Sequence, residues 1–388
     1  MDDDPSPPHP TGTLPGIPRV AAEPEWIVYI DLDAYYVSCE LRERPDLAGQ
    51  MVIVGPPPGS GHSRGVVLSA SYDARALGVR SAMPVGAAAR LAPTAVWLPP
   101  DFRKYEHVAL EVRRLLARFA PDVEPMSIDE AALRVGPGSA ERARGLAEQI
   151  QTALRSEMRL PSSLGVATTR IVAKIATDRA KPGGIVVVPA EEVASFLAPL
   201  PVRAIPGVGP KTEARLAEAG FSTIGALAEA RPADLAKVVG SFARELSALA
   251  RGVPREGPSS YSGPRARSTD RTFERDATTW EELVSTLGQL ASDLGDALAA
   301  EGWRYGAAGV AYRWGDFSRS SRMRSLPAMS DGPEPLREAV LRLGRELWDR
   351  SPPGGARTVR TVSVRAERLA RRSQRQVSLD EFPPTRAN

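Results

Sequence analysis

The chain has 388 residues, more than one domain usually contains, so its length predicts two or more compact units. Its 50 Lys and Arg against 47 Asp and Glu leave a net charge of only +3, which does not by itself indicate a nucleic-acid-binding protein. The single cysteine, Cys39, excludes an internal disulfide framework, and no apolar run is long enough to span a bilayer. We therefore expect a soluble, cytoplasmic protein.

The first half of the chain mixes predicted strands with predicted helices. Residues 1–23 are acidic and rich in proline, which predicts a disordered tail without a signal peptide. WIVYIDLD then predicts a buried strand, because β-branched and aromatic residues fill it without helical spacing. Further helices are expected at 35–48, 102–120 and 139–158, and further strands at MVIVG, AVWLP, AALRV and GIVVVP. This mixture predicts an α+β or α/β unit.

The second half begins with short helices and continues into a separate unit. Residues 190–252 are helical in pattern but broken by Gly and Pro, and the segment up to residue 267 has linker composition. The next unit is expected at 268–370, followed by a flexible tail at 371–388. In that unit we expect helices near 279–301 and 335–350 and strands near 306–314 and 357–366.

Carboxylates gather at two places in the first half. Asp31 and Asp33 end the strand WIVYIDLD, where period-two geometry directs both side chains to one face. Asp129 and Glu130 stand side by side in SIDEAAL, and their repulsion is costly unless a cation neutralises them. Mg²⁺ prefers such hard oxygen ligands, and two segments of carboxylates suit a two-metal centre for phosphoryl transfer. The alternative is a pair of solvated turns, and for Asp33 we favour the N-cap of the following helix.

Three other motifs offer phosphate-binding groups. Tyr72 and Arg75 are three residues apart, so on a helix they share a face. Lys181 precedes Pro182 and two glycines, which places an ammonium group in an open turn. Singly, each of these is also consistent with an ordinary surface position. Gly207 and Gly209 precede a helical run that closes at Gly220, a helix-hairpin-helix pattern that presents backbone N–H groups to a DNA backbone.

Five motifs together resemble a known family. IDLDAYYVSCE, SASYDARALGVRSAMP, SIDEAAL, LGVATTRIVAKIATDRAKPGG and IPGVGPKTEARL are similar, in this order, to the motifs of Y-family DNA polymerases of the bacterial DNA polymerase IV group. The resemblance covers about residues 24 to 370. It implies an α+β (mixed α/β) right-hand polymerase with an additional little-finger domain. The implied parts are a ferredoxin-like palm (24–34 and 102–189), small fingers (35–101), a helical thumb with the helix-hairpin-helix (190–252), a linker (253–267) and an α/β little finger (268–370).

The resemblance also implies roles for individual residues. Asp31, Asp129 and Glu130 match the catalytic carboxylates, and the backbone carbonyl of Leu32 would complete a site for two Mg²⁺ ions. The implied nucleotide contacts are Tyr36, Ser69, Tyr72, Arg75 and Lys181. Tyr36 matches the steric gate, whose ring leaves no room for a 2′-hydroxyl and so favours deoxynucleotides. Either Tyr35 or Tyr36 is expected to pack the first helix instead.

Two departures from the family pattern concern lesion preference. Leu68 stands where other members carry a small residue over the nascent base pair, and it would restrict bulky lesions. Ala132 and Arg134 replace the Tyr and Asp of the commoner SIDEAYLDV, although neither is a metal ligand.

Arginines and the C-terminal tail predict macromolecular partners. The expected DNA contacts are Gly207, Gly209, Lys211, Arg267, Arg271, Arg322 and Arg324. For the arginines of the second unit, the alternative is a solvated surface in an Arg-rich protein. RQVSLDEF resembles the peptide by which bacterial polymerases dock on the sliding clamp, with Gln376, Leu379 and Phe382 as anchors.

The expected function is template-directed, Mg²⁺-dependent DNA synthesis of the translesion type, with low fidelity and tolerance of damage. The expected enzyme is a monomer that takes dNTPs and primer-template DNA and does not bind membranes. One alternative is a catalytically silent protein of the same fold that only scaffolds DNA and clamp. A nucleotide cyclase with a palm-like two-metal layout is disfavoured by the hairpin motif and the Arg-rich second unit.

Overall fold

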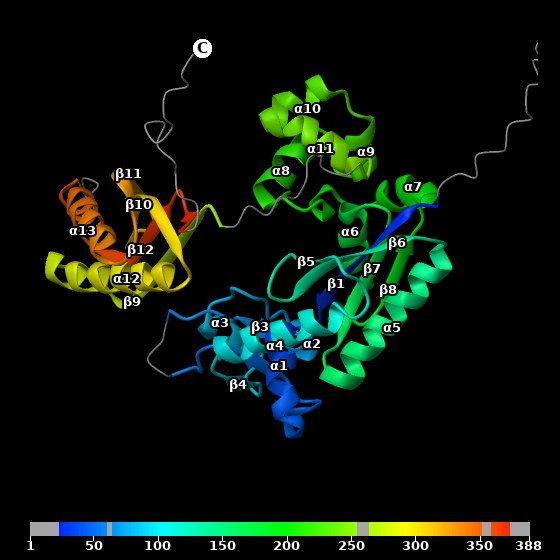
Figure 1. Cartoon of the computed structure of the whole chain (residues 1–388), viewed down its shortest axis with the longest axis horizontal. Coiled ribbons are helices and arrows are strands. Elements are labelled where there is room, and N and C mark those ends of the chain that lie inside the picture. Colours follow the sequence, from blue (N-terminus) through cyan, green and yellow to red (C-terminus); the bar gives the residue numbers. More distant parts are fainter. Residues whose placement is uncertain (1–22, 60–63, 254–263, 351–357, 373–388) are drawn as a thin grey trace, which may run out of the picture. The chain divides into compact units, whose positions relative to one another are not determined.

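The computed structural model describes residues 23–59, 64–253, 264–350 and 358–372. Its contacts divide the chain into two compact units, the first built mainly from residues before 257 and the second mainly from those after (Figure 1). The length-based expectation of more than one unit is therefore confirmed. Within the described residues, no helix is long and apolar enough to cross a membrane.

A five-stranded sheet, here called the palm sheet, forms the centre of the first unit. Its order is β5-β6-β1-β7-β8, with β1 antiparallel to both neighbours and β7 parallel to β8. The strands are β1 (Glu25–Leu32), β5 (Val123–Pro125), β6 (Glu130–Pro137), β7 (Ser162–Ala167) and β8 (Ile185–Val188). The central position of β1 explains its apolar composition, because both of its faces are covered.

Alternate residues of β1 enter two different cores. Val28, Ile30 and Leu32 pack in one core with α1 (Tyr35–Glu43), α4 (Phe102–Leu116) and α5 (Ala140–Met158). Ile27 and Tyr29 pack on the opposite face with α6 (Arg170–Ala180). By the same alternation, Asp31 lies on the α6 face of the palm sheet.

Helix α6 lies unusually close to the palm sheet. A methyl group at Gly165 of β7 would collide with the backbone of Ala173 and Thr177, so only glycine permits this approach. The buried hydroxyl of Thr177 donates to the carbonyl oxygen of Tyr29 at 3.1 Å and to that of Ala173 at 2.8 Å. These contacts hold α6 directly against β1.

A small sheet of order β3-β2-β4 follows the first helix. It contains β2 (Val52–Val54), β3 (Ser69–Ala70) and β4 (Val96–Leu98), accompanied by α2 (Tyr72–Ala76) and α3 (Val85–Leu91). Two predicted helices are shorter than expected. The helix predicted at 35–48 ends at Glu43, because Pro45 begins a separate 3₁₀ turn (Pro45–Leu47), and the one predicted at 102–120 ends at Leu116.

Short helices complete the first unit, as the Gly- and Pro-broken pattern predicted. They are α7 (Val193–Leu197), α8 (Pro210–Glu218), α9 (Ile224–Glu229), α10 (Pro232–Val239) and α11 (Ala243–Ala250). Leu216, Ile224, Leu227 and Leu246 are fully buried among them, in the same core as the α6 face of the palm sheet.

The second unit is an antiparallel sheet of order β11-β10-β12-β9 packed on two helices. The strands are β9 (Ala266–Ala277), β10 (Trp303–Trp314), β11 (Arg319–Ser330) and β12 (Val359–Glu367), with β13 (Ala370–Arg371) paired to β10, and the helices are α12 (Trp280–Ala300) and α13 (Glu334–Asp349). Both helices and the strands β10 and β12 were predicted from the sequence. The Arg-rich segments that form β9 and β11 were not predicted as strands.

Candidate active site

The two strands that carry the predicted catalytic carboxylates are neighbours. Asp31 of β1 pairs in register with Glu130, the first residue of β6, and the backbone N–H of Leu32 donates to the carbonyl oxygen of Asp129 at 2.9 Å. Asp31 is only 4% exposed, so its carboxyl group is largely removed from water. The pairing of β1 with β6 therefore brings two carboxyl groups from distant segments together.

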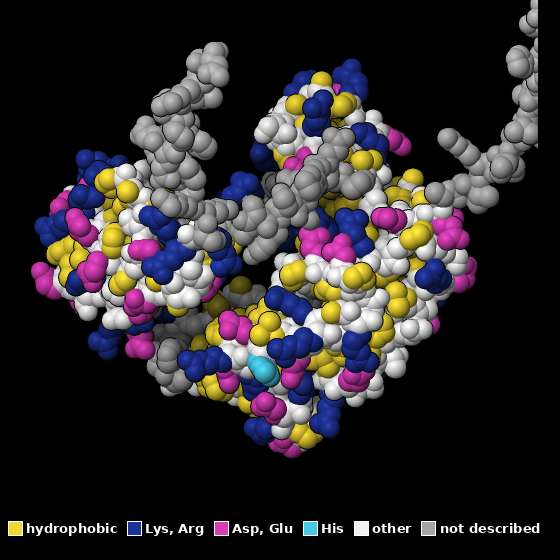
Figure 2. Space-filling model, viewed as in Figure 1, with side chains coloured by type: hydrophobic (Ala, Val, Ile, Leu, Met, Phe, Trp, Pro, Cys, Tyr) yellow, Lys and Arg dark blue, Asp and Glu magenta, His cyan; other side chains and the backbone are white. Residues whose placement is uncertain are grey.

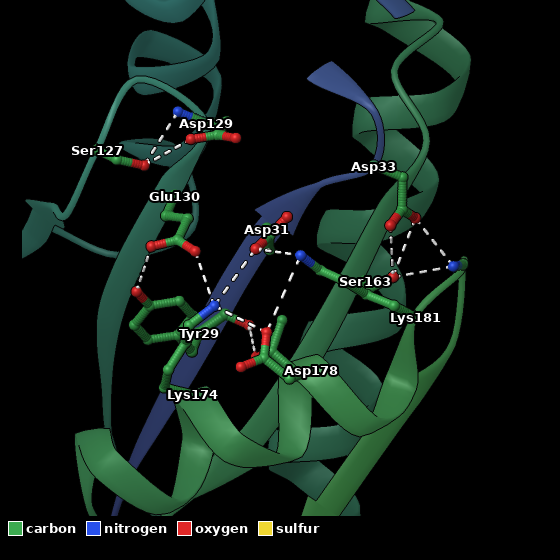
Figure 3. Close-up of polar contacts among 12 residues, drawn as sticks. Tyr29, Asp31, Asp33, Ser127, Asp129, Glu130, Ser163, Lys174, Asp178 and Lys181 are labelled. Atoms are coloured by element: carbon green, nitrogen blue, oxygen red, sulfur yellow. Dashed lines mark hydrogen bonds and ion pairs between the residues drawn. The ribbon is translucent and has the colours of Figure 1, made fainter. Parts of the chain in front are cut away.

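Two lysines of the α6 segment reach into this carboxyl pair (Figure 3). The Nζ atom of Lys174 lies 2.7 Å from Glu130, 2.9 Å from Asp178 and 3.4 Å from Asp31. Lys181 follows the helix as its C-cap residue, and its Nζ atom lies 2.6 Å from Asp31. Each carboxyl group of the cluster therefore contacts an ammonium group.

Burial and neighbouring charges shift the pKa values of this cluster in different directions. Burial raises the pKa of the Asp31 carboxyl to about 7, and the adjacent Glu130 adds to the rise, whereas Lys181 and Lys174 oppose it. Burial also disfavours ionisation of Glu130, but hydrogen bonds with Asp31, Lys174 and Tyr29 lower its pKa below the usual value. Glu130 is therefore the more readily ionised of the two, and Asp31 depends more on a nearby cation.

Tyr29 and Lys174 both stay protonated, so each can donate a hydrogen bond to Glu130. Burial and the neighbouring Glu130 raise the pKa of Tyr29, so its hydroxyl remains a donor to Glu130, at 2.8 Å. Burial alone would lower the pKa of Lys174, but the carboxylates of Asp178 and Glu130 raise it above the usual range. Lys174 therefore stays charged at neutral pH.

Asp129 stands apart from this cluster. Its carboxylate accepts a hydrogen bond from the Ser127 hydroxyl at 2.6 Å, as Figure 3 shows. Across the parts of the chain that the structure describes, no three His, Cys, Asp or Glu side chains are arranged to surround a metal ion. The Asp31–Glu130 pair nevertheless suits a divalent cation, because its ligand atoms are hard carboxylate oxygens. The ammonium groups beside these oxygens show that the pair already attracts positive charge.

Asp33 does not cap the first helix, and that preferred interpretation was wrong. The N-cap residue of α1 is Ala34, which makes no side-chain capping bond. The carboxylate of Asp33 is 2% exposed and instead accepts hydrogen bonds from Tyr72 and Ser163 side chains and from the backbone N–H of Gly183. These three groups donate more hydrogen bonds to the Asp33 carboxylate than a single capping interaction with a helix N-terminus would. Because Ser163 belongs to β7 on the α6 face, Asp31 and Asp33 do share a face, as predicted.

The predicted nucleotide contacts of the small sheet and α2 lie close together. Tyr72 begins α2, and the guanidinium of Arg75 lies 5.0 Å from the centre of its ring, so the two side chains share a face. The Nε atom of Arg75 donates to the carbonyl oxygen of Ala70 at 2.9 Å. Ser69 is buried in β3 immediately before them.

The adjacent tyrosines at the start of α1 have different surroundings. Tyr35 is 2% exposed and donates its hydroxyl to the carbonyl oxygen of Tyr105 at 2.6 Å, so it is the one that packs the helix. Tyr36 is half-buried, with its ring 4.7 Å from that of Tyr105 and 6.3 Å from that of Phe102. Leu68 is also only partly buried against the same core.

Glycines of the helix-hairpin-helix segment lie around helix α8. Gly207 has a φ of +97° and Gly220 of +87°, conformations that favour glycine, and Gly209 is the N-cap residue of α8. Lys211 follows in the first turn of that helix. The N–H groups in the first turn of α8 after Pro210 have no acceptor earlier in the helix, as at every helix start.

The four predicted DNA-contacting arginines lie on the two edge strands of the second unit. Arg267 forms a two-pronged ion pair with Glu301, and Arg324 approaches Glu346 of α13 at 3.4 Å. Arg271 pairs in register with Val362, and Arg322 with Val310, both of which belong to the core beneath the helices. These arginines therefore project towards the helix-bearing side. Figure 2 shows Lys and Arg side chains over the visible surface of this unit, with Asp and Glu among them. Gln376, Leu379 and Phe382 lie outside the described residues.

Sequence reasoning missed several residues of this centre. Lys181 was predicted only as a phosphate contact, and Lys174 was given no role, although residues four and seven apart on a helix share a face. That spacing joins Lys174 to Asp178 and then to Lys181. The roles of Tyr29 and Ser163 could not be predicted from the sequence around them. Their contacts with Glu130 and Asp33 form only when distant strands pair.

Comparisons with known proteins agree with this arrangement. A model of the impB/mucB/samB family matches residues 30–178, and a model of the C-terminal domain of that family matches residues 264–379. A model of the IMS family HHH motif matches residues 190–221. The DNA polymerase IV of Methanoculleus marisnigri is 39% identical over 357 residues, which cover 92% of this chain and 98% of the relative.

Solved structures show the same fold. A Y-family DNA polymerase chimera of Dbh and Dpo4 has a TM-score of 0.78 and 25% identity, covering 88% of this chain and 98% of its own. An insertion ternary complex of Dbh DNA polymerase has a TM-score of 0.59 and 25% identity, covering 89% of this chain and 99% of its own. The chain therefore belongs to the Y family of DNA-directed DNA polymerases and is similar to DNA polymerase IV.

Proposed function

We propose that this protein is a translesion DNA polymerase that extends a primer 3′ end by two-metal phosphoryl transfer. The observation that carries the proposal is the pairing of Asp31 with Glu130 on neighbouring strands, with Asp129 in the adjoining turn. These three carboxylates and the carbonyl of Leu32 would hold two Mg²⁺ ions. When bound, the ions would supply positive charge to the phosphates and to the attacking oxygen.

The chain's own residues bind and orient the nucleotide in this proposal. Tyr72, Arg75 and Lys181 bind the triphosphate, since a charged guanidinium and ammonium group suit phosphate oxygens. Ser69, buried in β3 just before α2, contributes a hydroxyl to the same pocket. Tyr36 lies beneath the sugar as the steric gate, and Leu68 narrows the space over the base pair. We infer low fidelity and damage tolerance, with bulky adducts restricted by Leu68.

The remaining partners follow from the family. The Dbh complex solved as an insertion ternary complex supports primer-template DNA and a dNTP as substrates here too. The helix-hairpin-helix (Gly207, Gly209, Lys211) would hold the DNA backbone, as would the edge-strand arginines Arg267, Arg271, Arg322 and Arg324. The domain boundaries, the monomeric state, the cytoplasmic location and clamp docking stay predictions.

Replacement of Asp129 with Asn tests the carboxylate assignment. Loss of one ligand charge removes transition-state stabilisation but leaves the DNA contacts, so turnover should fall by roughly 10³-fold or more. Primer-template affinity should change little. The measurement is single-turnover primer extension on undamaged and adducted templates, combined with a DNA-binding titration.

A matched control is Asp122→Asn, which removes an exposed carboxylate that pairs with Arg134 at 3.5 Å. This variant should extend primers normally. Near-normal extension by Asp129→Asn would refute the assignment. A wild-type protein that binds DNA but extends no primer would instead support the silent scaffold.

A further inference from the structure

Three carboxyl groups share two ammonium groups at the end of β1. Asp31 contacts both lysines, Glu130 contacts Lys174, and Asp178 contacts Lys174 at 2.9 Å and Lys181 at 3.9 Å. Figure 3 shows Lys174 at the centre of this group, with its ammonium directed between the carboxyl groups. Lys174 therefore occupies a position beside the carboxylates proposed to bind metal.

Lys174 is also held by groups that bind no metal in the proposed mechanism. Asp178, four residues later on α6, is 46% exposed and accepts the same ammonium group. The ring of Tyr29 lies 5.3 Å from the Nζ atom. The ammonium group therefore keeps a carboxylate partner even when Asp31 and Glu130 are engaged elsewhere.

We propose that Lys174 is a resident cation of the carboxylate pair, which a divalent metal displaces towards Asp178 when it binds. The inference rests on the proposed metal centre and adds a determinant of its affinity. Two neighbouring buried carboxyl groups without a cation repel each other, so Lys174 stabilises the centre before metal arrives. The same charge opposes a metal ion at the same oxygens. Lys174 is thus a positioning residue whose charge lowers metal affinity.

Asp178 tunes this competition. With its carboxylate present, the displaced ammonium group retains an ion pair, and displacement costs less. Without it, Lys174 would depend on Asp31 and Glu130 alone and would compete more strongly with the metal. Lys174 and Asp178 should therefore change metal affinity in opposite directions, which a purely structural role would not produce.

The first experiment measures Mn²⁺ binding to the full chain, without nucleotide or DNA, by electron paramagnetic resonance of free Mn²⁺. Lys174→Met keeps the side-chain stem but removes the charge, and it should tighten binding about tenfold or more. Lys174→Gln should do the same, and it carries the test if the Met variant folds poorly. Lys237→Met, which removes an exposed charge that pairs with Asp234, should leave the affinity unchanged.

The second experiment is a double-mutant cycle with Asp178→Asn. In the wild-type background this variant should weaken Mn²⁺ binding several-fold, and in the Lys174→Met background it should have a much smaller effect. Equal weakening in both backgrounds would mean that Asp178 acts on the metal directly, and it would overturn the proposed displacement.

Unchanged affinity in both Lys174 variants would likewise overturn the inference. If that result accompanies normal primer extension by the wild type, only the role of Lys174 is refuted. If the wild type neither binds Mn²⁺ nor extends a primer, the proposed metal centre itself fails.

Discussion

At the scale of single residues, the neighbouring tyrosines Tyr35 and Tyr36 have different environments. Tyr35 is buried and hydrogen-bonded within the core, whereas Tyr36 is half-buried beside Tyr105 and Phe102. A side chain whose hydroxyl is satisfied inside the protein serves packing. The partly exposed ring is the one available to a substrate, which supports Tyr36 as the steric gate.

Tyr36→Ala should open the space beneath the sugar and markedly raise ribonucleotide insertion, with a smaller effect on dNTP use. The measurement is the ratio of kcat/KM for a dNTP to that for the matching rNTP. Tyr35→Ala is the comparison: it should destabilise the fold by about 3 kcal/mol or more without changing this ratio. If Tyr35→Ala alone raises ribonucleotide insertion, the assignment is displaced by one residue.

The sequence could predict the acidic residues better than their partners. Asp31 and Glu130 stand in recognisable motifs, and their cross-strand pairing agrees with the expected centre. The contacts of Asp33 could not be predicted, because its donors Tyr72, Ser163 and Gly183 come from three separate segments. Local capping was the simpler interpretation, but it was wrong since only the tertiary fold brings these donors together.

At the scale of elements, the fit between α6 and the palm sheet places both lysines. The helix contacts the backbone of β7 at Gly165, and Thr177 ties it to β1 through the carbonyl of Tyr29. Lys174 and Lys181 project from this helix segment to Asp31. A change in the helix-to-sheet distance would therefore alter the ion pairs of the centre.

Gly165→Ala should separate α6 from the sheet, because its methyl group would collide with backbone atoms that cannot rotate away. We expect a loss of about 3 kcal/mol in the free energy of unfolding, at the upper end of overpacking effects. Primer extension should fall as well, although residue 165 would not touch the substrate. Urea unfolding and steady-state kinetics measure the two effects.

The control is Gly145→Ala within α5, where an added methyl group meets nothing within 4 Å. It should stabilise the protein by about 0.5–1 kcal/mol, since alanine favours a helix over glycine. Wild-type stability of Gly165→Ala would show that α6 can move without cost.

At the scale of the whole molecule, each compact unit has its own core. The second unit buries the aromatic side chains Tyr305, Tyr312 and Trp314 beneath its helices. Its central strands β10 and β12 carry enough apolar residues to be predicted, and so do α12 and α13. The edge strands β9 and β11 are mostly exposed and rich in Arg, Ser and Thr, so they lack the apolar period that identifies a strand.

Docking on the sliding clamp would determine how long the whole enzyme stays on a template. Replacing Leu379 and Phe382 with Ala should abolish clamp stimulation of long-template synthesis, since buried anchors of short peptides supply about 2 kcal/mol or more each. Distributive synthesis without clamp should persist. Both activities are measured on one protein, with Thr385→Ala in the same tail as control. Unchanged stimulation would contradict clamp docking through this peptide.

The hydrogen bonds of Asp33 have a consequence for the time at which the enzyme matures. The donors to Asp33 are 39, 130 and 150 positions away along the chain. Formation of these hydrogen bonds therefore closes long loops, which slows folding. The segment of β1 is synthesised early, but its neighbours β6 and β7 and the backbone donor of Gly183 follow only when most of the palm sheet has been synthesised. Nucleotide binding should therefore appear late in synthesis, after the last palm strand has left the ribosome, and truncated products should carry no partially active pocket.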